Sequence, residues 1–232
     1  MQTRRKSTRP LRRSCGADKP IDSSAMINRR RLCLVLALVL APGFFLRGTT
    51  AAPAKIIVFV GSSIFHRWTN LTTQMAPLPI LNRAFDGAQT ADMLAGFDSF
   101  VQVHPKVVAY YCGSNDVDAD DTADAIFGRI RQFSERVRTA LPGTRMIFVS
   151  INRAPEKRDR WDVVDAVNRR VEAYAASTPH LEYVDVNPAL FGRDGTPRVE
   201  LYLSDQLHFR PPAYDELARI LKPVVKRAFE AD

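Results

Sequence analysis

The stretch Val58-Phe59-Val60-Gly61-Ser62-Ser63-Ile64-Phe65-His66 decides how this chain can fold. Its apolar start is typical of a strand that is buried on both faces. The run breaks at Gly61 and continues at once into a segment that we expect to be a helix. A plain turn would account for the glycine, but it leaves the two successive hydroxyl groups unexplained.

Short apolar runs like this one recur along the chain from Lys55 onward, and longer segments with apolar residues every three or four positions alternate with them. Such alternation predicts an α/β fold, in which helices cover a parallel sheet. The predicted strands are Lys55–Val60, Leu78–Leu81, Val107–Tyr111, Met146–Ser150 and Leu181–Val186.

Three longer helices are predicted from the apolar stripes. The first follows Asp120-Asp121-Thr122 and ends at Pro142-Gly143, because acidic residues favour a helix start and this pair favours its end. The second carries an apolar stripe from Trp161 to Tyr174. The third begins at Pro211-Pro212, and we expect Pro223 to bend it.

The basic character of the chain comes from its first 54 residues. The net charge is +8, but eleven Lys and Arg residues against two Asp residues precede Lys55, which leaves the remainder at −1. The remainder therefore has no overall electrostatic reason to bind nucleic acid. We expect residues 55–232 to form one domain and residues 1–54 to be an N-terminal extension with a signal peptide.

The predicted signal peptide consists of Arg29-Arg30-Arg31, the apolar run Leu32–Leu46 and a group of small residues up to Ala54. The run is shorter than the roughly 18–20 residues that span a bilayer, so export to the periplasm or medium is favoured over a permanent anchor. The chain would then meet the membrane only transiently, during export. Met26 precedes the arginines, and we expect translation to start there.

Cysteine usage allows no disulfide within the predicted mature domain, since Cys112 is its only cysteine. We interpret Cys112 as a small buried residue at a strand end. No His or Cys pair has the spacing of zinc ligands, and we expect no metal or cofactor.

Ligands of an open parallel sheet bind at the carboxyl ends of its strands, and the loops after the predicted strands carry the unusual residues. Ester hydrolysis needs a hydroxyl nucleophile, a base, an acid that orients the base, and donors for the oxyanion. Ser63 is a candidate nucleophile whose own N–H faces an oxyanion, because it stands where a strand turns into a helix. His208 and Asp205 are candidates for the base and the orienting acid.

Gly87 and Asn115 are candidates for the remaining oxyanion donors, through a backbone N–H and a side-chain amide respectively. Each candidate has a plainer alternative on its own. Asp205 could cap the last helix, Gly87 could serve a turn, and Asn115 could form an Asx turn.

Four segments in order along the chain resemble the sequence blocks of the SGNH hydrolases, also called the GDSL esterases and lipases. They are Gly61-Ser62-Ser63-Ile64, Asn82-Arg83-Ala84-Phe85-Asp86-Gly87, Gly113-Ser114-Asn115-Asp116 and Asp205-Gln206-Leu207-His208. The resemblance covers residues 55–225. It implies a three-layer α/β/α sandwich with a flavodoxin-like sheet of about five strands, and it assigns the nucleophile, oxyanion donors, acid and base to the residues named above.

One departure from the family pattern is Ser62, which stands where the name-giving aspartate would be. That aspartate is not the acid of the triad, so the chemistry is little affected, although a nucleophile at Ser62 would shift the assignment by one residue. Among other residues, His66 is expected to line the helix surface or pocket wall. Arg153 could meet an anionic substrate group, with a solvated arginine as the favoured alternative.

The sequence therefore predicts an exported serine esterase or acylhydrolase that forms an acyl-enzyme. No insertion is long enough for a large lid, so we expect short acyl chains or acetylated carbohydrate as substrate. The alternatives are a lysophospholipase or thioesterase, and an inactive member that binds a glycan. A basic arm retained on a cytoplasmic protein is a further alternative, which a mature N-terminus near Lys55 would exclude.

Overall fold

The computed structural model describes residues 54–231, so the predicted start site and all of the predicted signal peptide before Ala54 lie outside the described residues. Five strands form one parallel sheet in the order β2-β1-β3-β4-β5. This is the flavodoxin-like order. The α/β prediction is thus confirmed, and the strands are β1 (Ala54–Gly61), β2 (Ile80–Asn82), β3 (Pro105–Tyr111), β4 (Arg145–Val149) and β5 (Leu181–Val184).

Strand β2 begins two residues later than its apolar run predicts. Pro79 has no N–H to give to a ladder, and its carbonyl oxygen accepts the Ile57 N–H at 2.9 Å as the chain enters the sheet. Strand β5 ends two residues early, at Val184, because the Val186 N–H turns to the Ser150 hydroxyl at 3.0 Å.

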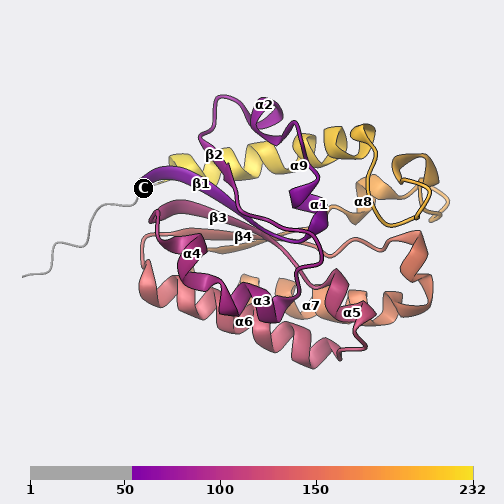
Figure 1. The fold of residues 1–232 in the computed structure, drawn as a ribbon, viewed down its shortest axis with the longest axis horizontal. Helices are drawn as coiled ribbons and strands as arrows, with labels where there is room; N and C mark the ends of the chain where they lie inside the picture. The colour runs from indigo at the N-terminus through magenta and orange to yellow at the C-terminus, as the bar shows by residue number, and fades with distance from the viewer. Residues whose placement is uncertain (1–53, 232) are drawn as a thin grey trace, which may run out of the picture. The chain divides into compact units, whose positions relative to one another are not determined.

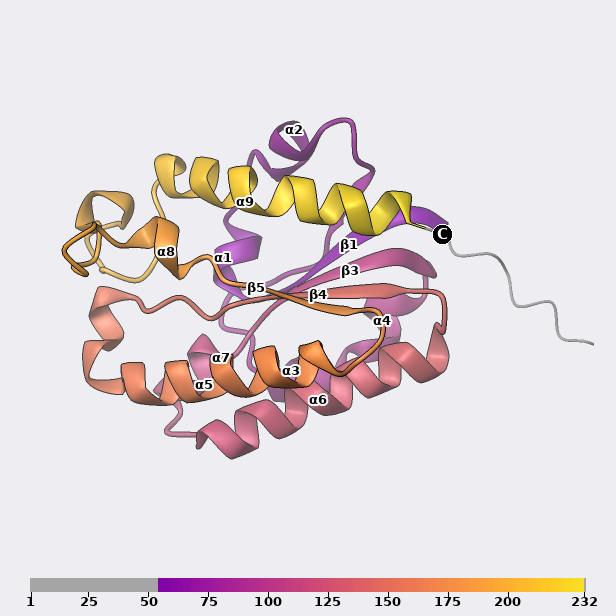
Figure 2. The same ribbon diagram turned by 180° about the vertical axis from the view of Figure 1, so that it is seen from behind.

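Helices cover both faces of the sheet, as Figures 1 and 2 show from opposite sides. On one face lie α6 and α7 with three shorter helices, and on the other lies α9 with α1, α2 and α8. The helices are α1 (Ser63–His66), α2 (Leu71–Met75), α3 (Thr90–Ala95), α4 (Phe97–Val101), α5 (Ser114–Asp118), α6 (Ala123–Ala140), α7 (Trp161–Ala176), α8 (Asn187–Leu190) and α9 (Pro211–Glu230), with 3₁₀ segments η1 (Pro155–Arg160) and η2 (Val199–Leu201).

The central strands divide their side chains between two apolar cores. Alternate residues of a strand point to opposite faces, so Ile57 and Phe59 join one core while Val58 and Val60 join the other. The predicted stripe of α6 lies in the second core, and α9 packs on the first. β1 is therefore apolar at every position from Ile57 to Val60 because both of its faces are covered.

Helix α9 continues unbroken past Pro223 to Glu230. Its apolar face holds it on the sheet, since Leu217, Leu221 and Val225 are all buried there. Among residues 54–231, no helix is long and apolar enough to cross a membrane.

Candidate active site

The candidate site lies at the carboxyl edge of the sheet, where β1 ends at Gly61 and turns directly into α1. Gly61 has φ +146°, and a Cβ there would lie 1.8 Å from the carbonyl oxygen of Tyr111 on β3. Only glycine allows the two strands to approach this closely. The Ser62 N–H then donates to the same Tyr111 oxygen at 3.0 Å, which fixes where Ser63 starts the helix.

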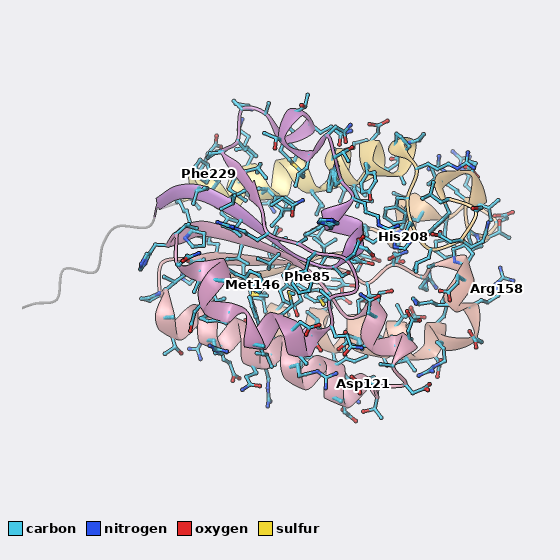
Figure 3. All side chains as sticks on the ribbon, viewed as in Figure 1. Phe85, Asp121, Met146, Arg158, His208 and Phe229 are labelled. Carbon is cyan, nitrogen blue, oxygen red and sulfur yellow. The ribbon has the colours of Figure 1, made fainter. Side chains whose placement is uncertain are left out.

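Three side chains meet at this edge, although Ser63 lies 145 residues before His208 in the sequence. The Nε2 atom of His208 lies 3.0 Å from Ser63 Oγ, and its Nδ1 atom lies 2.7 Å from Asp205 Oδ2. Ser63 is only 8 % exposed, and His208 is half-buried. Figure 3 shows His208 at the end of the sheet away from Phe229, which lies near the end of α9.

Asp205 is held as a carboxylate by its neighbours. Burial works against its ionisation, but it accepts hydrogen bonds from the His208 ring and from the N–H groups of His208 and Leu207. Together these outweigh burial and lower the pKa of Asp205 to about 2. An ionised Asp205 keeps the imidazole proton on Nδ1 and leaves Nε2 free to accept a proton from Ser63.

The 203–208 loop that carries Asp205 and His208 is closed at its base. The Leu203 N–H donates to the His208 carbonyl oxygen at 2.7 Å, and Tyr202 pairs with Phe209 in a short antiparallel bridge. Arg210 Nε donates to the Tyr202 carbonyl oxygen at 2.7 Å. The loop is therefore anchored to the fold at the residues on either side of it.

Residues 82–87, called here the Gly87 segment, run beside α1 and the end of β1. Asn82 Nδ2 donates to the Phe65 carbonyl oxygen at 2.7 Å, and the Phe85 N–H donates to the Gly61 carbonyl oxygen at 3.0 Å. Gly87 itself has φ +74°, a left-handed conformation that suits glycine. The structure thus joins this segment to the residues around Ser63.

Asn115 lies at the start of α5, at the same edge. One hydrogen of its side-chain amide goes to the Ala88 carbonyl oxygen at 2.8 Å, so Asn115 is tied to the residue after Gly87. This bond makes the two candidate oxyanion donors parts of one connected arrangement.

Asp116 has a structural role that the sequence motif did not reveal. Its carboxylate is fully buried, accepts the Thr90 N–H at 3.0 Å and the Thr90 hydroxyl, and pairs with Arg129 at 3.0 Å. It thereby ties α5 to the start of α3 and to α6. The one sequence feature that pointed to Asp116 was its position directly after Asn115 in the Gly-x-Asn-Asp motif.

The structure also shows the surroundings of four other residues that the sequence analysis singled out. Ser62 is buried, His66 Nδ1 contacts the Ala84 carbonyl oxygen at 3.0 Å, and burial raises the pKa of the Cys112 thiol well above its usual value. Arg153 is more engaged than a solvated arginine, because its guanidinium lies 4.5 Å from the ring centre of Phe191. Within residues 54–231, no three His, Cys, Asp or Glu side chains are grouped to hold a metal ion.

A parallel sheet that brings a serine hydroxyl, an imidazole and a carboxylate into one hydrogen-bonded line at its carboxyl edge has the arrangement of a serine hydrolase. The sequence model of the GDSL-like lipase/acylhydrolase family matches residues 54–215. The chain belongs to this family and is an ester-hydrolysing enzyme. No protein of curated function matches it in sequence.

Solved structures share the fold at low identity. A GDSL-like lipase from Bacteroides thetaiotaomicron is 24 % identical over 75 % of this chain and 89 % of its own, with a TM-score of 0.65. A carbohydrate esterase of family 3 from Talaromyces cellulolyticus is 17 % identical over 75 % and 98 %, with a TM-score of 0.61. A variant acetyl-xylooligosaccharide esterase from Geobacillus is 18 % identical over 78 % and 96 %, with a TM-score of 0.61.

Proposed function

We propose that this enzyme hydrolyses carboxylic esters of short acyl groups through an acyl-enzyme on Ser63. The observation that carries the proposal is the hydrogen-bonded line from Ser63 Oγ to His208 Nε2 at 3.0 Å and from His208 Nδ1 to Asp205 at 2.7 Å. This geometry lets the imidazole take the serine proton while the carboxylate stabilises the resulting cation.

In the proposed mechanism, Ser63 Oγ attacks the ester carbonyl carbon as its proton passes to His208 Nε2. The carbonyl oxygen becomes negative and is bound by the N–H groups of Ser63 and Gly87 and by the Asn115 amide. His208 then gives the proton to the leaving alcohol, and the acyl group stays on Ser63. Water attacks this acyl-enzyme with His208 again as base, which releases the acid and restores the serine.

Acetyl or other short acyl esters of carbohydrates are the proposed substrates. Two observations support this choice. Structural neighbours include a carbohydrate esterase and an acetyl-xylooligosaccharide esterase. In addition, residues 191–210, which connect α8 to α9, are held to the fold, since Arg198 contacts both the Ala189 carbonyl oxygen and Glu216. A segment held in this way does not form a large lid over a long acyl chain.

We also propose that the enzyme is exported and that its mature chain begins near Lys55. The predicted signal peptide ends at Ala54, which is also where β1 and the family match begin. Sequencing the N-terminus of the native protein from the periplasm or medium tests this, and a protein that keeps Met26 and stays in the cytoplasm would contradict it.

The deciding experiment compares Ser63→Ala with Ser62→Ala on p-nitrophenyl esters from acetate to palmitate. Removing the nucleophile is expected to lower kcat by about 10⁵–10⁶-fold and to abolish labelling by a fluorophosphonate. Ser62→Ala is the matched control and keeps the labelling. Labelling that is lost in Ser62→Ala instead would move the nucleophile by one residue, and activity that rises with chain length would contradict the short-acyl substrate.

A further inference from the structure

Lys157 is a buried charge that the proposed mechanism does not use. Its side chain is only 2 % exposed, and its Nζ atom contacts Asp118 Oδ1 and lies 3.3 Å from Glu156 Oε2. A buried ammonium is unfavourable unless it is paired and hydrogen-bonded, and Lys157 is both. The neighbouring charged residues Glu156, Arg158 and Asp159 are exposed. The buried ion pair of Lys157 therefore points to a structural connection at this place.

The pairing joins two elements of the candidate site. Asp118 is the last residue of α5, the short helix that carries Asn115 near its start. Lys157 lies in η1, which follows β4. Arg160 of η1 also forms an ion pair, with Nη1 2.5 Å from Asp120 Oδ1, but Asp120 lies beyond the end of α5 and its side chain is largely exposed. Figure 3 shows Arg158 of η1 at the same end of the sheet as His208.

The other side of η1 contacts the 203–208 loop. The Glu156 N–H donates to the carbonyl oxygen of Gln206 at 3.2 Å. Gln206 has φ +58°, a left-handed conformation that is unfavourable for a residue with a Cβ. Such a conformation persists where the surrounding structure enforces it. Gln206 lies between Asp205 and His208, so its backbone sets how these two side chains meet.

We propose that Lys157 is a positioning residue for the acid and base of the active site. By fixing η1 against α5, it holds the Glu156 N–H where it keeps the Gln206 turn left-handed. The turn at Gln206 then holds Asp205 against the His208 imidazole and fixes the positions of both side chains relative to Asn115. This inference rests on the proposed function of the same site.

Groups from three elements face the His208 imidazole, and they define what a loosened turn would change. Asp205 is on the loop itself, Ser63 is on α1, and Asp86, paired with Arg67, acts electrostatically on His208 from the segment before Gly87. Displacing Asp205 leaves the other groups in place. The protonated imidazole is then attracted less strongly by its nearest carboxylate, so the protonated form of His208 is less favoured.

Lys157→Met tests the proposal, because it removes the charge and keeps much of the apolar stem. We expect kcat for p-nitrophenyl acetate to fall about 10- to 100-fold with KM unchanged, since a small misplacement of reacting groups has effects of this size. We also expect the midpoint of the acid limb of the kcat/KM profile to move to lower pH. A residue with a purely structural role would not move that midpoint in folded enzyme.

Arg160→Gln is the matched control, because Arg160 lies on the same segment as Lys157 but its ion-pair partner, Asp120, is exposed to solvent. It is expected to change kcat less than twofold. Should Lys157→Met fail to fold, Asp118→Asn is the deciding variant, since Glu156 still neutralises the ammonium. It is expected to lower kcat several-fold and to shift the acid limb in the same direction.

Gln206→Gly tests the route through the turn. Glycine adopts the left-handed conformation without the Cβ penalty, so the loop depends less on η1. Lys157→Met is therefore expected to lower kcat at least threefold less in the Gln206→Gly background than in the natural one. Equal losses in both backgrounds would overturn the proposed route.

Unchanged kcat and acid limb in folded Lys157→Met, or in folded Asp118→Asn where that variant decides, would overturn the positioning role while leaving the proposed function intact. Failure of the proposed function has a different signature. In that case the unaltered enzyme neither hydrolyses the esters nor reacts with the fluorophosphonate.

Discussion

At the scale of single residues, Asp205 is a side chain whose negative charge the structure favours through direct hydrogen bonds. Asp205→Asn keeps the size of the side chain but removes the charge that holds the imidazole proton on Nδ1. We expect kcat to fall by about 10³–10⁴-fold while the fold is retained, because a wrong tautomer disables the base. Steady-state kinetics on a short ester, with the melting temperature measured in parallel, checks this.

The matched control is Asp194→Asn, because Asp194 is also a turn aspartate with a lowered pKa, through its bonds from Thr196, and it is fully exposed. Its substitution should leave kcat unchanged. An Asp205→Asn enzyme with more than a tenth of the natural kcat would contradict the orienting role.

Asp205 also links stability to pH. Its pKa is about 2 in the folded protein against an ordinary value of 3.8, so its contribution to stability is present above about pH 4 and is lost as the pH falls toward 2. We expect the Asp205→Asn variant to show a smaller drop in melting temperature over this range than the natural enzyme. Equal drops would contradict the lowered pKa.

At the scale of elements, an ion pair clamps the Gly87 segment to α1. Arg67, just after α1, makes a two-point contact with Asp86, with Nε–Oδ1 at 3.0 Å and Nη2–Oδ2 at 3.2 Å. Both side chains are nearly half exposed, so the pair is worth at most about 1 kcal/mol. Its position matters more than its strength, because Gly87 is the next residue.

Asp86→Asn is therefore expected to lower kcat about two- to fivefold with almost no change in melting temperature. Salt should reduce the kcat of the natural enzyme but have little effect on that of the variant. Glu230→Gln is the control, since its pair with Lys226 is also exposed but lies at the end of α9. If both variants keep the natural kcat, the clamp has no role in positioning the oxyanion donor.

Helices and strands with a local apolar pattern were predicted from the sequence, and those held mainly by contacts between distant residues were not. Strand β3 and helix α6 carry unbroken apolar patterns, and both were predicted within two residues of their bounds. The short helices α3 and α5 have no such pattern. They are held by the buried Asp116 contact with Thr90, which exists only once the chain has folded.

The same limit applied to the candidate site. Ser63, Gly87, Asn115, Asp205 and His208 could be named because each belongs to a short motif at a strand end. Lys157 could not, because the stretch Pro155–Arg160 has the composition of an exposed charged loop. Only the structure shows that one of its five charged side chains turns inward.

At the scale of the whole molecule, the sheet order explains why the site forms where it does. β1 lies between β2 and β3, so the loops that follow these three strands emerge side by side at one edge. The 203–208 loop reaches that edge because α9, which it precedes, begins there and packs along the sheet. No local pattern could have predicted the 3.0 Å approach of Ser63 and His208, since it depends on the whole strand order.

The two cores make the last prediction one about the boundary of the domain. Every side chain in them lies between Ile57 and Phe229, and β1 passes between them. A truncated chain of residues 50–232 is therefore expected to unfold in one cooperative transition and to keep the kcat/KM of the full-length enzyme. A second truncation that starts at Gly61 removes the strand between β2 and β3, and it should not fold. Calorimetry and a short-ester assay on both chains decide the matter, and a 50–232 chain that melts broadly or loses activity would mean that earlier residues belong to the folded enzyme.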